Sequence, residues 1–145
     1  MSTIQENAAG IFVRGIAVWL LIIAVETVHG VVRTLLIEPA IGDLRARQIG
    51  VLIGSMLIVA VSLVTVRWIG ARNTEELIAI GVVWVVLTVT FEVTLGLFVA
   101  GLSMERILSD YDISRGGLMI FGLLIMLLAP VISAYFRGWS ASDPN

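Results

Sequence analysis

The stretch QIGVLIGSMLIVAVSLVTV, residues 48–66, lies between Arg47 and Arg67 and contains no charged side chain. An α-helix rises about 1.5 Å per residue, so about 20 apolar residues cross the roughly 30 Å hydrocarbon core of a bilayer. The apolar residues run continuously and do not alternate with polar ones, which argues against a strand of a membrane β-barrel. The stretch is therefore predicted to be a membrane-spanning helix.

Three further stretches have the length and apolar character of a membrane span. Only the last of them is free of charge, and the other two carry ionisable residues within otherwise apolar segments. The four predicted spans, in chain order, are 16–37, 48–66, 77–101 and 116–136. They predict an all-α integral membrane four-helix bundle that forms a single membrane domain over residues 1–145.

The composition agrees with lipid as the solvent of most side chains. The chain is 59% hydrophobic and only 14% charged, with a mean hydropathy of +1.04, whereas a soluble domain carries about 25% charged residues. All nine basic residues are Arg and they are dispersed, which argues against a nucleic-acid partner. The chain has no Cys, which excludes disulfides, thiolate catalysis and zinc sites built from Cys. The expected partners are membrane lipids and either further copies of the chain or a larger membrane complex.

Four spans place both termini on one side of the membrane. We call this side, with the loop 67–76, side A, and the side with the loops 38–47 and 102–115, side B. Arg residues flank the two sides in nearly equal number, so the positive-inside rule leaves the orientation open. Residues 1–10 have no basic segment before an apolar one and are expected to be an uncleaved tail. We expect the inner (cytoplasmic) membrane of a bacterium as the location.

The Trp residues are distributed on one side. All four fall on or toward side A, where amphipathic Trp rings commonly anchor membrane helices at the level of the headgroups. These anchors are predicted to be Trp19, Trp68, Trp84 and Trp139.

An internal repeat relates the two halves of the chain, approximately residues 16–70 and 77–138. Five acidic or Gly positions recur, at steps of 4, 8, 5 and 7 residues in the first half and of 4, 9, 5 and 7 in the second. The first set is Glu26, Gly30, Glu38, Asp43 and Gly50, and the second is Glu92, Gly96, Glu105, Asp110 and Gly117. Because each unit has two spans, the repeat predicts two tandem hairpins related by a pseudo-two-fold axis along the membrane normal.

Glu26, His29 and Arg33 form an ionisable stripe on the first span. At about 100° per residue, positions i, i+3 and i+7 share one helical face. A charged side chain facing lipid costs at least about 2.5 kcal/mol, so the stripe is expected to face protein or water. It is either a proton or ion relay, with Glu26 as the carrier, or a satisfied cluster in which Arg33 pairs with Glu26 or with loop carboxylates.

Glu92 occupies the position equivalent to Glu26 in the repeat. It has no basic neighbour on its own helix, and a meeting of the two carboxylates near the pseudo-axis would let them share protons or a cation. Glu26 and His29 also form the Glu-x-x-His pair of di-iron bundles, but such sites need two pairs, and this chain has one His. We therefore predict no metal and no cofactor, although ligation of a haem by the single His stays open.

The side-B loops carry four acids that recur in the repeat and are a second candidate site: Glu38, Asp43, Glu105 and Asp110. Asp43 and Asp110 are expected near the first turns of the second and fourth spans, where acids interact favourably with the helix dipole. These loop acids either cap helices and form salt bridges at the headgroups, or line a mouth that binds a cation or a partner.

Small residues and proline predict the local shape of the spans. Gly50 and Gly54 give the Gly-x-x-x-Gly spacing that lets membrane helices approach closely. Pro39 is expected to end or bend the first span, and Pro130 to kink the fourth.

Two functions stay open on this sequence, and the motifs of soluble enzymes are absent from it. The first is a small ion- or proton-coupled transporter or channel that acts as a homo-oligomer and uses Glu26 and Glu92, with His29 and Arg33 adjusting Glu26. The second is a non-catalytic structural or accessory subunit of a larger membrane complex. A membrane-embedded enzyme is the third and least favoured reading.

Overall fold

The computed structural model describes the backbone of residues 2–138, and this part of the chain is helical without any strand. Trp139 and the rest of the C-terminal tail lie outside the described residues. The elements, in chain order, are α1 (Ser2–Val32), η1 (Arg33–Ile37), α2 (Glu38–Ile41), α3 (Asp43–Ile69), α4 (Thr74–Thr94), η2 (Leu95–Val99), α5 (Met104–Ser109), η3 (Ile113–Arg115) and α6 (Met119–Phe136).

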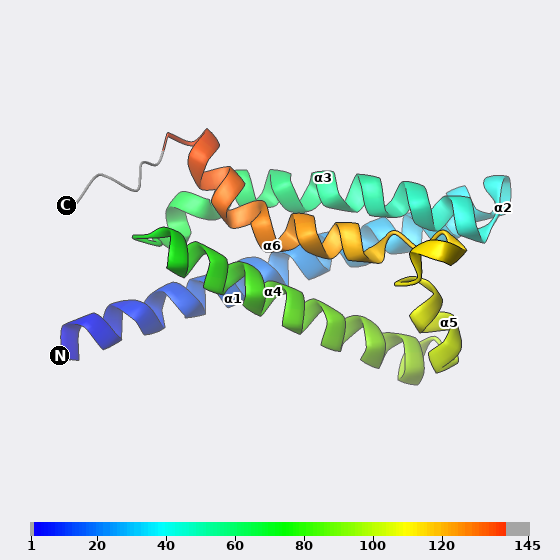
Figure 1. Cartoon of the computed structure of the whole chain (residues 1–145), viewed down its shortest axis with the longest axis horizontal. Helices are drawn as coiled ribbons and strands as arrows, with labels where there is room; N and C mark the ends of the chain where they lie inside the picture. The colour runs from blue at the N-terminus through cyan, green and yellow to red at the C-terminus, as the bar shows by residue number, and fades with distance from the viewer. Residues whose placement is uncertain (1, 139–145) are drawn as a thin grey trace.

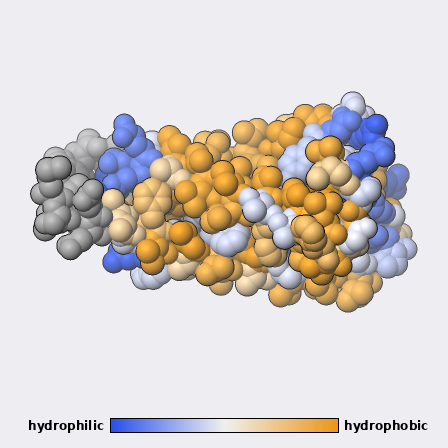
Figure 2. All heavy atoms as spheres, turned by 90° about the horizontal axis from the view of Figure 1, so that it is seen from below, coloured by the Kyte–Doolittle hydropathy of each residue, from blue (hydrophilic) through white to orange (hydrophobic). Residues whose placement is uncertain are grey.

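Four helical segments are long and apolar enough to cross a membrane, which confirms the predicted number of spans. They are Ala8–Ile41, Asp43–Ile69, Thr74–Val99 and Met119–Phe136. The first is longer than predicted at both ends, because α1 begins within the N-terminal segment and α2 continues to Ile41. Apolar side chains cover the middle of the face shown in Figure 2, and hydrophilic ones gather at its two ends. This distribution is the one expected for a protein surrounded by a bilayer.

The four spans form a closed ring of neighbours. α1 packs on α3, α3 on α6, α6 on α4, and α4 on the side-A half of α1. α1 and α4 then diverge toward side B, where the segment that contains α5 folds across (Figure 1). The bundle is therefore tightly packed toward side A and wider toward side B.

The packed half of the bundle is built around Trp84, which is fully buried. Its indole Nε1 donates a hydrogen bond to the Gly15 carbonyl at 2.8 Å, and the Trp19 indole donates one to the Thr88 hydroxyl at 3.0 Å. Both Trp residues thus join α1 to α4 instead of anchoring the protein at the headgroups, and the prediction for these two was wrong. Trp68 is exposed, as an interfacial anchor would be.

The first span ends later than Pro39 predicts. Pro39 lies in the first turn of α2, which continues to Ile41, and the chain turns at Gly42, whose φ is +86°. The π-helix η1 comes immediately before, where the missing N–H of Pro39 removes a regular helical hydrogen bond. The fourth span contains Pro130 and bends in its C-terminal part, as predicted (Figure 1).

The two side-B connections differ in structure. The first is the short α2, and the second contains α5 and η3 before α6 begins at Met119. Asp43 lies in the first turn of α3, as predicted. Asp110 does not play the same part for α6, because it ends α5, and its backbone carbonyl accepts a hydrogen bond from the Met119 N–H at 3.1 Å.

Candidate functional site

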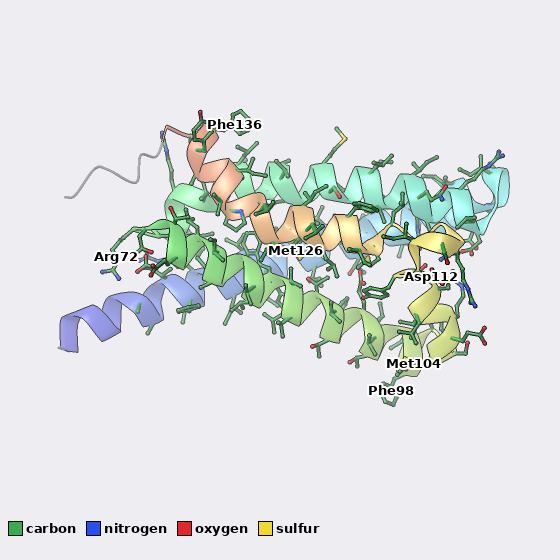
Figure 3. The ribbon with its side chains drawn as sticks, viewed as in Figure 1. Arg72, Phe98, Met104, Asp112, Met126 and Phe136 are labelled. Carbon is green, nitrogen blue, oxygen red and sulfur yellow. The ribbon has the colours of Figure 1, made fainter. Side chains whose placement is uncertain are left out.

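A cavity of about 760 Å³ occupies the wide half of the bundle. Its wall comes from the C-terminal halves of α1 and α4, the N-terminal halves of α3 and α6, and the α5 segment, and most of the wall is apolar. The packed core forms its floor, where the Thr88 hydroxyl donates a hydrogen bond to the Met126 sulfur at 3.3 Å. Figure 3 shows Met126 within the bundle. The ionisable residues of the wall are Glu26, His29, Arg33, Arg47, Glu92, Asp110 and Tyr111.

Glu26 and His29 are joined as a pair on the α1 side of the cavity. The His29 Nδ1 and the Glu26 Oε2 lie 3.2 Å apart. The Glu26 carboxylate also rests on α3, because a Cβ built on Gly54 would lie only 2.8 Å from Oε2. The absence of a side chain at Gly54 therefore makes the space that Glu26 occupies.

Arg33 packs against Gly50, the other Gly of the Gly-x-x-x-Gly motif on α3. A Cβ on Gly50 would lie 2.8 Å from the Arg33 Cδ, so the stem of this side chain packs against α3. The Gly-x-x-x-Gly motif of α3 thus leaves space for the side chains of Glu26 and Arg33 from the first span. The expected ion pair of Arg33 with Glu26 or a loop carboxylate is not formed within residues 8–138.

Glu92 lines the cavity from α4. Its side chain is exposed in the isolated chain, and its carboxylate has no hydrogen bond or ion pair to another described residue. The structure therefore brings Glu26, His29, Arg33 and Glu92 to a single cavity, with the two carboxylates on two different helices. Groups of this kind bind protons, cations or hydrogen-bond donors, and ionisable residues at membrane depth are commonly functional.

A closed ring of ion pairs crosses the side-B end of the cavity. Arg47 pairs with Asp43 at 3.1 Å and with Asp110, while Arg106 pairs with Asp43 at 3.0 Å and with Asp110 at 3.2 Å. The ring ties the start of α3 to α5. The Gln48 side-chain amide adds a hydrogen bond to the Gly116 carbonyl at 3.0 Å.

The other two loop acids lie apart from this ring. Glu38 starts α2 and has no ion pair with a described residue. Glu105 is 85% exposed and reaches Arg115 only at 3.7 Å. The four predicted loop acids therefore do not converge on one point, and only Asp110 of the four lines the cavity.

Tyr111 was not anticipated as a site residue. Its side chain enters the cavity from the α5 segment, and its buried hydroxyl has no hydrogen-bond partner among the described residues. Burial, followed by the negative charges of Glu92 and Asp110, raises the pKa of the hydroxyl to about 12. The hydroxyl is therefore protonated at neutral pH and is available as a donor. An aromatic residue between two acids in a short polar loop was the only signal in the sequence.

Four more buried polar atoms of the wall lack a partner in the described part of the chain. They are the Glu26 Oε1, the His29 Nε2 and the Ser55 hydroxyl, and the Arg47 Nε at the mouth is a fourth. A buried polar atom without a hydrogen bond costs about 1–3 kcal/mol, so such atoms in a cavity point to a ligand or to water. Ser55 faces the cavity from α3, one residue after Gly54, and sequence reasoning passed over it as a common small residue of membrane helices.

The described residues do not form a metal site. No three His, Asp or Glu side chains among residues 8–138 converge closely enough to hold a metal ion. Glu26 and His29 are a pair on one helix, and Glu92 lines the same cavity from α4.

Comparisons of this chain with protein-family models, with curated proteins and with solved structures found no match. The chemistry of the cavity is therefore the basis on which a function is assigned.

Proposed function

We propose that this protein is a small membrane transporter in which Glu26 and Glu92 carry protons or cations through the cavity. The observation that carries the proposal is that the two carboxylates of the membrane spans line one cavity from two different helices. His29 adjusts Glu26 through their hydrogen bond, and Arg33 supplies a positive charge about two turns nearer side B.

The ring of ion pairs suits a closed side-B mouth. Partly exposed ion pairs such as those of Arg106 contribute little stability each, about 0–1 kcal/mol, so a conformational change can break them at low cost. The unpaired polar atoms of the wall suit a carrier, because a substrate could satisfy them with hydrogen bonds. In this proposal, transport alternates between the closed mouth and one in which α5 moves away from α3.

The duplicated architecture is part of the proposal. Each half of the chain supplies a hairpin, α1 with α3 and α4 with α6, and both first helices end in a π-helical segment, η1 and η2, next to the cavity. These likenesses support a tandem repeat with a pseudo-two-fold axis along the membrane normal. We further propose that the protein acts as a homo-oligomer in the inner membrane of a bacterium, because four helices alone rarely enclose a complete pathway.

Proton flux into reconstituted vesicles tests the function. The vesicles enclose a pH-sensitive dye, and a potassium diffusion potential drives protons inward. The expected result is flux above that of protein-free vesicles, lost in Glu26→Gln and in Glu92→Gln and kept in Glu75→Gln. Glu75 is a matched control because it is an exposed carboxylate at the other end of α4.

Two outcomes would contradict the proposal. The first is wild-type flux that equals the flux of protein-free vesicles. The second is unchanged flux in both Gln variants of the cavity. If the same variants instead released a larger stoichiometric partner during gentle extraction, the chain would be an accessory subunit of a membrane complex.

A further inference from the structure

The inner part of the cavity presents hydrogen-bond acceptors. The Glu26 Oε1 has no partner among the described residues, and neither does the carboxylate of Glu92. The His29 Nδ1 faces the Glu26 carboxylate, which favours the proton on Nδ1 and leaves Nε2 as an acceptor in the neutral ring. The Ser55 hydroxyl is buried nearby on α3, with an oxygen that can also accept. A ligand that satisfies these atoms must bring several N–H groups.

The charge of the inner part points to a cationic ligand. Two carboxylates face this space, and the single imidazole next to them can neutralise at most one. Arg47 and Asp110 at the mouth already neutralise one another within the ring of ion pairs. Hydrogen bonds between an ammonium and a carboxylate are about twice as strong as neutral ones. A protonated amine therefore matches both the charge and the hydrogen-bonding of the inner wall.

The outer part of the cavity presents donors. Arg33 lies about 10 Å nearer side B than Glu26, and its guanidinium has no ion pair to another described residue. The Tyr111 hydroxyl carries a proton and lacks a partner within the described chain. This end can hold an acceptor of the same ligand or water, and its positive charge favours an orientation with the ammonium innermost.

The remaining wall is apolar and reaches the lipid-facing surface. The apolar side chains of Val31 on α1, Leu35 on η1, and Leu95 and Val99 on η2 line the cavity and are 39–76% exposed. The segments η1 and η2 continue α1 and α4 toward side B, where these two helices diverge (Figure 1). Phe98 of the same segment points away from the bundle (Figure 3). An apolar ligand body can therefore enter sideways from the side-B leaflet.

We infer that the cavity binds an amphipathic primary ammonium compound, with the N–H groups on Glu26, Glu92 and Ser55 and the apolar body between α1 and α4. The volume of the cavity, about 760 Å³, lies in the range of sites for small organic ligands. This inference names the substrate class of the transporter proposed above and rests on that proposal. The same ammonium chemistry is present in free amines and in the headgroup of phosphatidylethanolamine.

Calorimetric titration of the whole protein in phosphatidylcholine nanodiscs tests the inference. The probes are 4-phenylbutylamine and its N,N,N-trimethyl analogue, which share the apolar body and the positive charge but differ in N–H groups. We expect the amine to bind about tenfold more tightly than the analogue, because only the amine donates hydrogen bonds to the carboxylates. Equal or tighter binding of the analogue would overturn the inference.

Variants locate the binding. Glu92→Gln should weaken amine binding about tenfold, and Glu75→Gln should leave it unchanged. If Glu92→Gln does not fold, as judged by circular dichroism, Ser55→Ala provides the same test with a smaller expected loss. Unchanged amine binding in a folded Glu92→Gln or Ser55→Ala protein would overturn the site.

The lipid composition of the nanodisc distinguishes a free amine from a lipid headgroup as the source of the ammonium. Weaker apparent binding of the amine in discs that contain phosphatidylethanolamine identifies the lipid headgroup as the occupant, and unchanged binding identifies a free amine. Both results keep the primary ammonium as the ligand. Loss of amine selectivity with intact proton flux overturns the substrate class alone, whereas lost flux with intact amine binding overturns transport.

Discussion

The Glu26 carboxylate on α1 lies directly over Gly54 on α3, so close that a Cβ at Gly54 would stand 2.8 Å from the Glu26 Oε2. The missing side chain of Gly54 thus leaves space on the face of α3, and an ionisable side chain from the neighbouring helix fills it. A Gly pair that usually brings two backbones together here holds a carboxylate at the wall of a cavity. Gly54 therefore bears on the proposed transport, because it makes room for the Glu26 carboxylate.

Gly54→Ala should displace the Glu26 carboxylate without unfolding the protein. The clash involves the end of a flexible side chain, which can rotate away, so we expect a stability change of about 1 kcal/mol or less. The hydrogen bond to His29 and the proton flux should both be lost. Gly30→Ala is the matched control, because a Cβ there would meet no atom within 4 Å. Equal flux in the two variants would contradict the assigned position of Glu26.

Gly81→Ala should behave in the opposite way. A Cβ at Gly81 would run into the backbone carbonyl of Leu127 on α6, which cannot rotate away as a side chain can. We expect a loss of about 1–3 kcal/mol or more in the free energy of unfolding, read as a lower thermal midpoint in detergent. A midpoint equal to that of the wild type would show that α4 and α6 are not in close contact at Gly81.

The ring of ion pairs should show measurable coupling across side B. A double-mutant cycle with Asp43→Ala and Arg106→Ala is expected to give about 0.5–1 kcal/mol, because both side chains are partly exposed. The coupling should weaken as salt is added. Glu105 and Arg115, which are 85% and 61% exposed at 3.7 Å, form the control pair and should show almost none. Equal coupling in the two pairs would argue against the ring.

Tyr111 should make the free energy of unfolding depend on pH in the alkaline range. Its pKa is raised from 10.0 to about 12, so the folded protein binds the hydroxyl proton more tightly than the unfolded chain. The free energy of unfolding should therefore be unaffected below about pH 10 and should fall as the pH rises from about 10 to about 12. Tyr111→Phe should remove this part of the pH dependence. The absorbance of tyrosinate checks it, and ionisation of Tyr111 at its ordinary pKa would contradict the buried position.

The number and approximate position of the spans could be predicted from the sequence, because long apolar segments have few alternatives in a protein of this composition. The shared face of Glu26, His29 and Arg33 also follows from helical periodicity. The sequence does not show which helix this face contacts, since that depends on which helix lies next to α1. Only the structure places Arg33 and Glu26 over Gly50 and Gly54.

Contacts between distant segments escaped sequence reasoning. Arg47 and Asp110 are 63 positions apart, and so are Asp43 and Arg106, so nothing local marks their pairing. Trp84 was assigned to the headgroup level because Trp is frequent there, yet its apolar ring fills the core and its N–H finds the Gly15 carbonyl. Burial of a Trp with a satisfied N–H is equally favourable physically, and composition cannot distinguish the two.

The central claim is that Glu26 and Glu92 face one cavity, and an infrared titration of the carboxyl groups tests it most directly. The carboxyl band of Glu92 is assigned by its loss in Glu92→Gln. Carboxylates that are close enough to interact influence one another's titration, so Glu26→Gln should displace the titration midpoint of Glu92, while Glu75→Gln leaves it in place. A Glu92 midpoint that stays in place in Glu26→Gln would contradict a shared cavity and with it the proposed transport pathway.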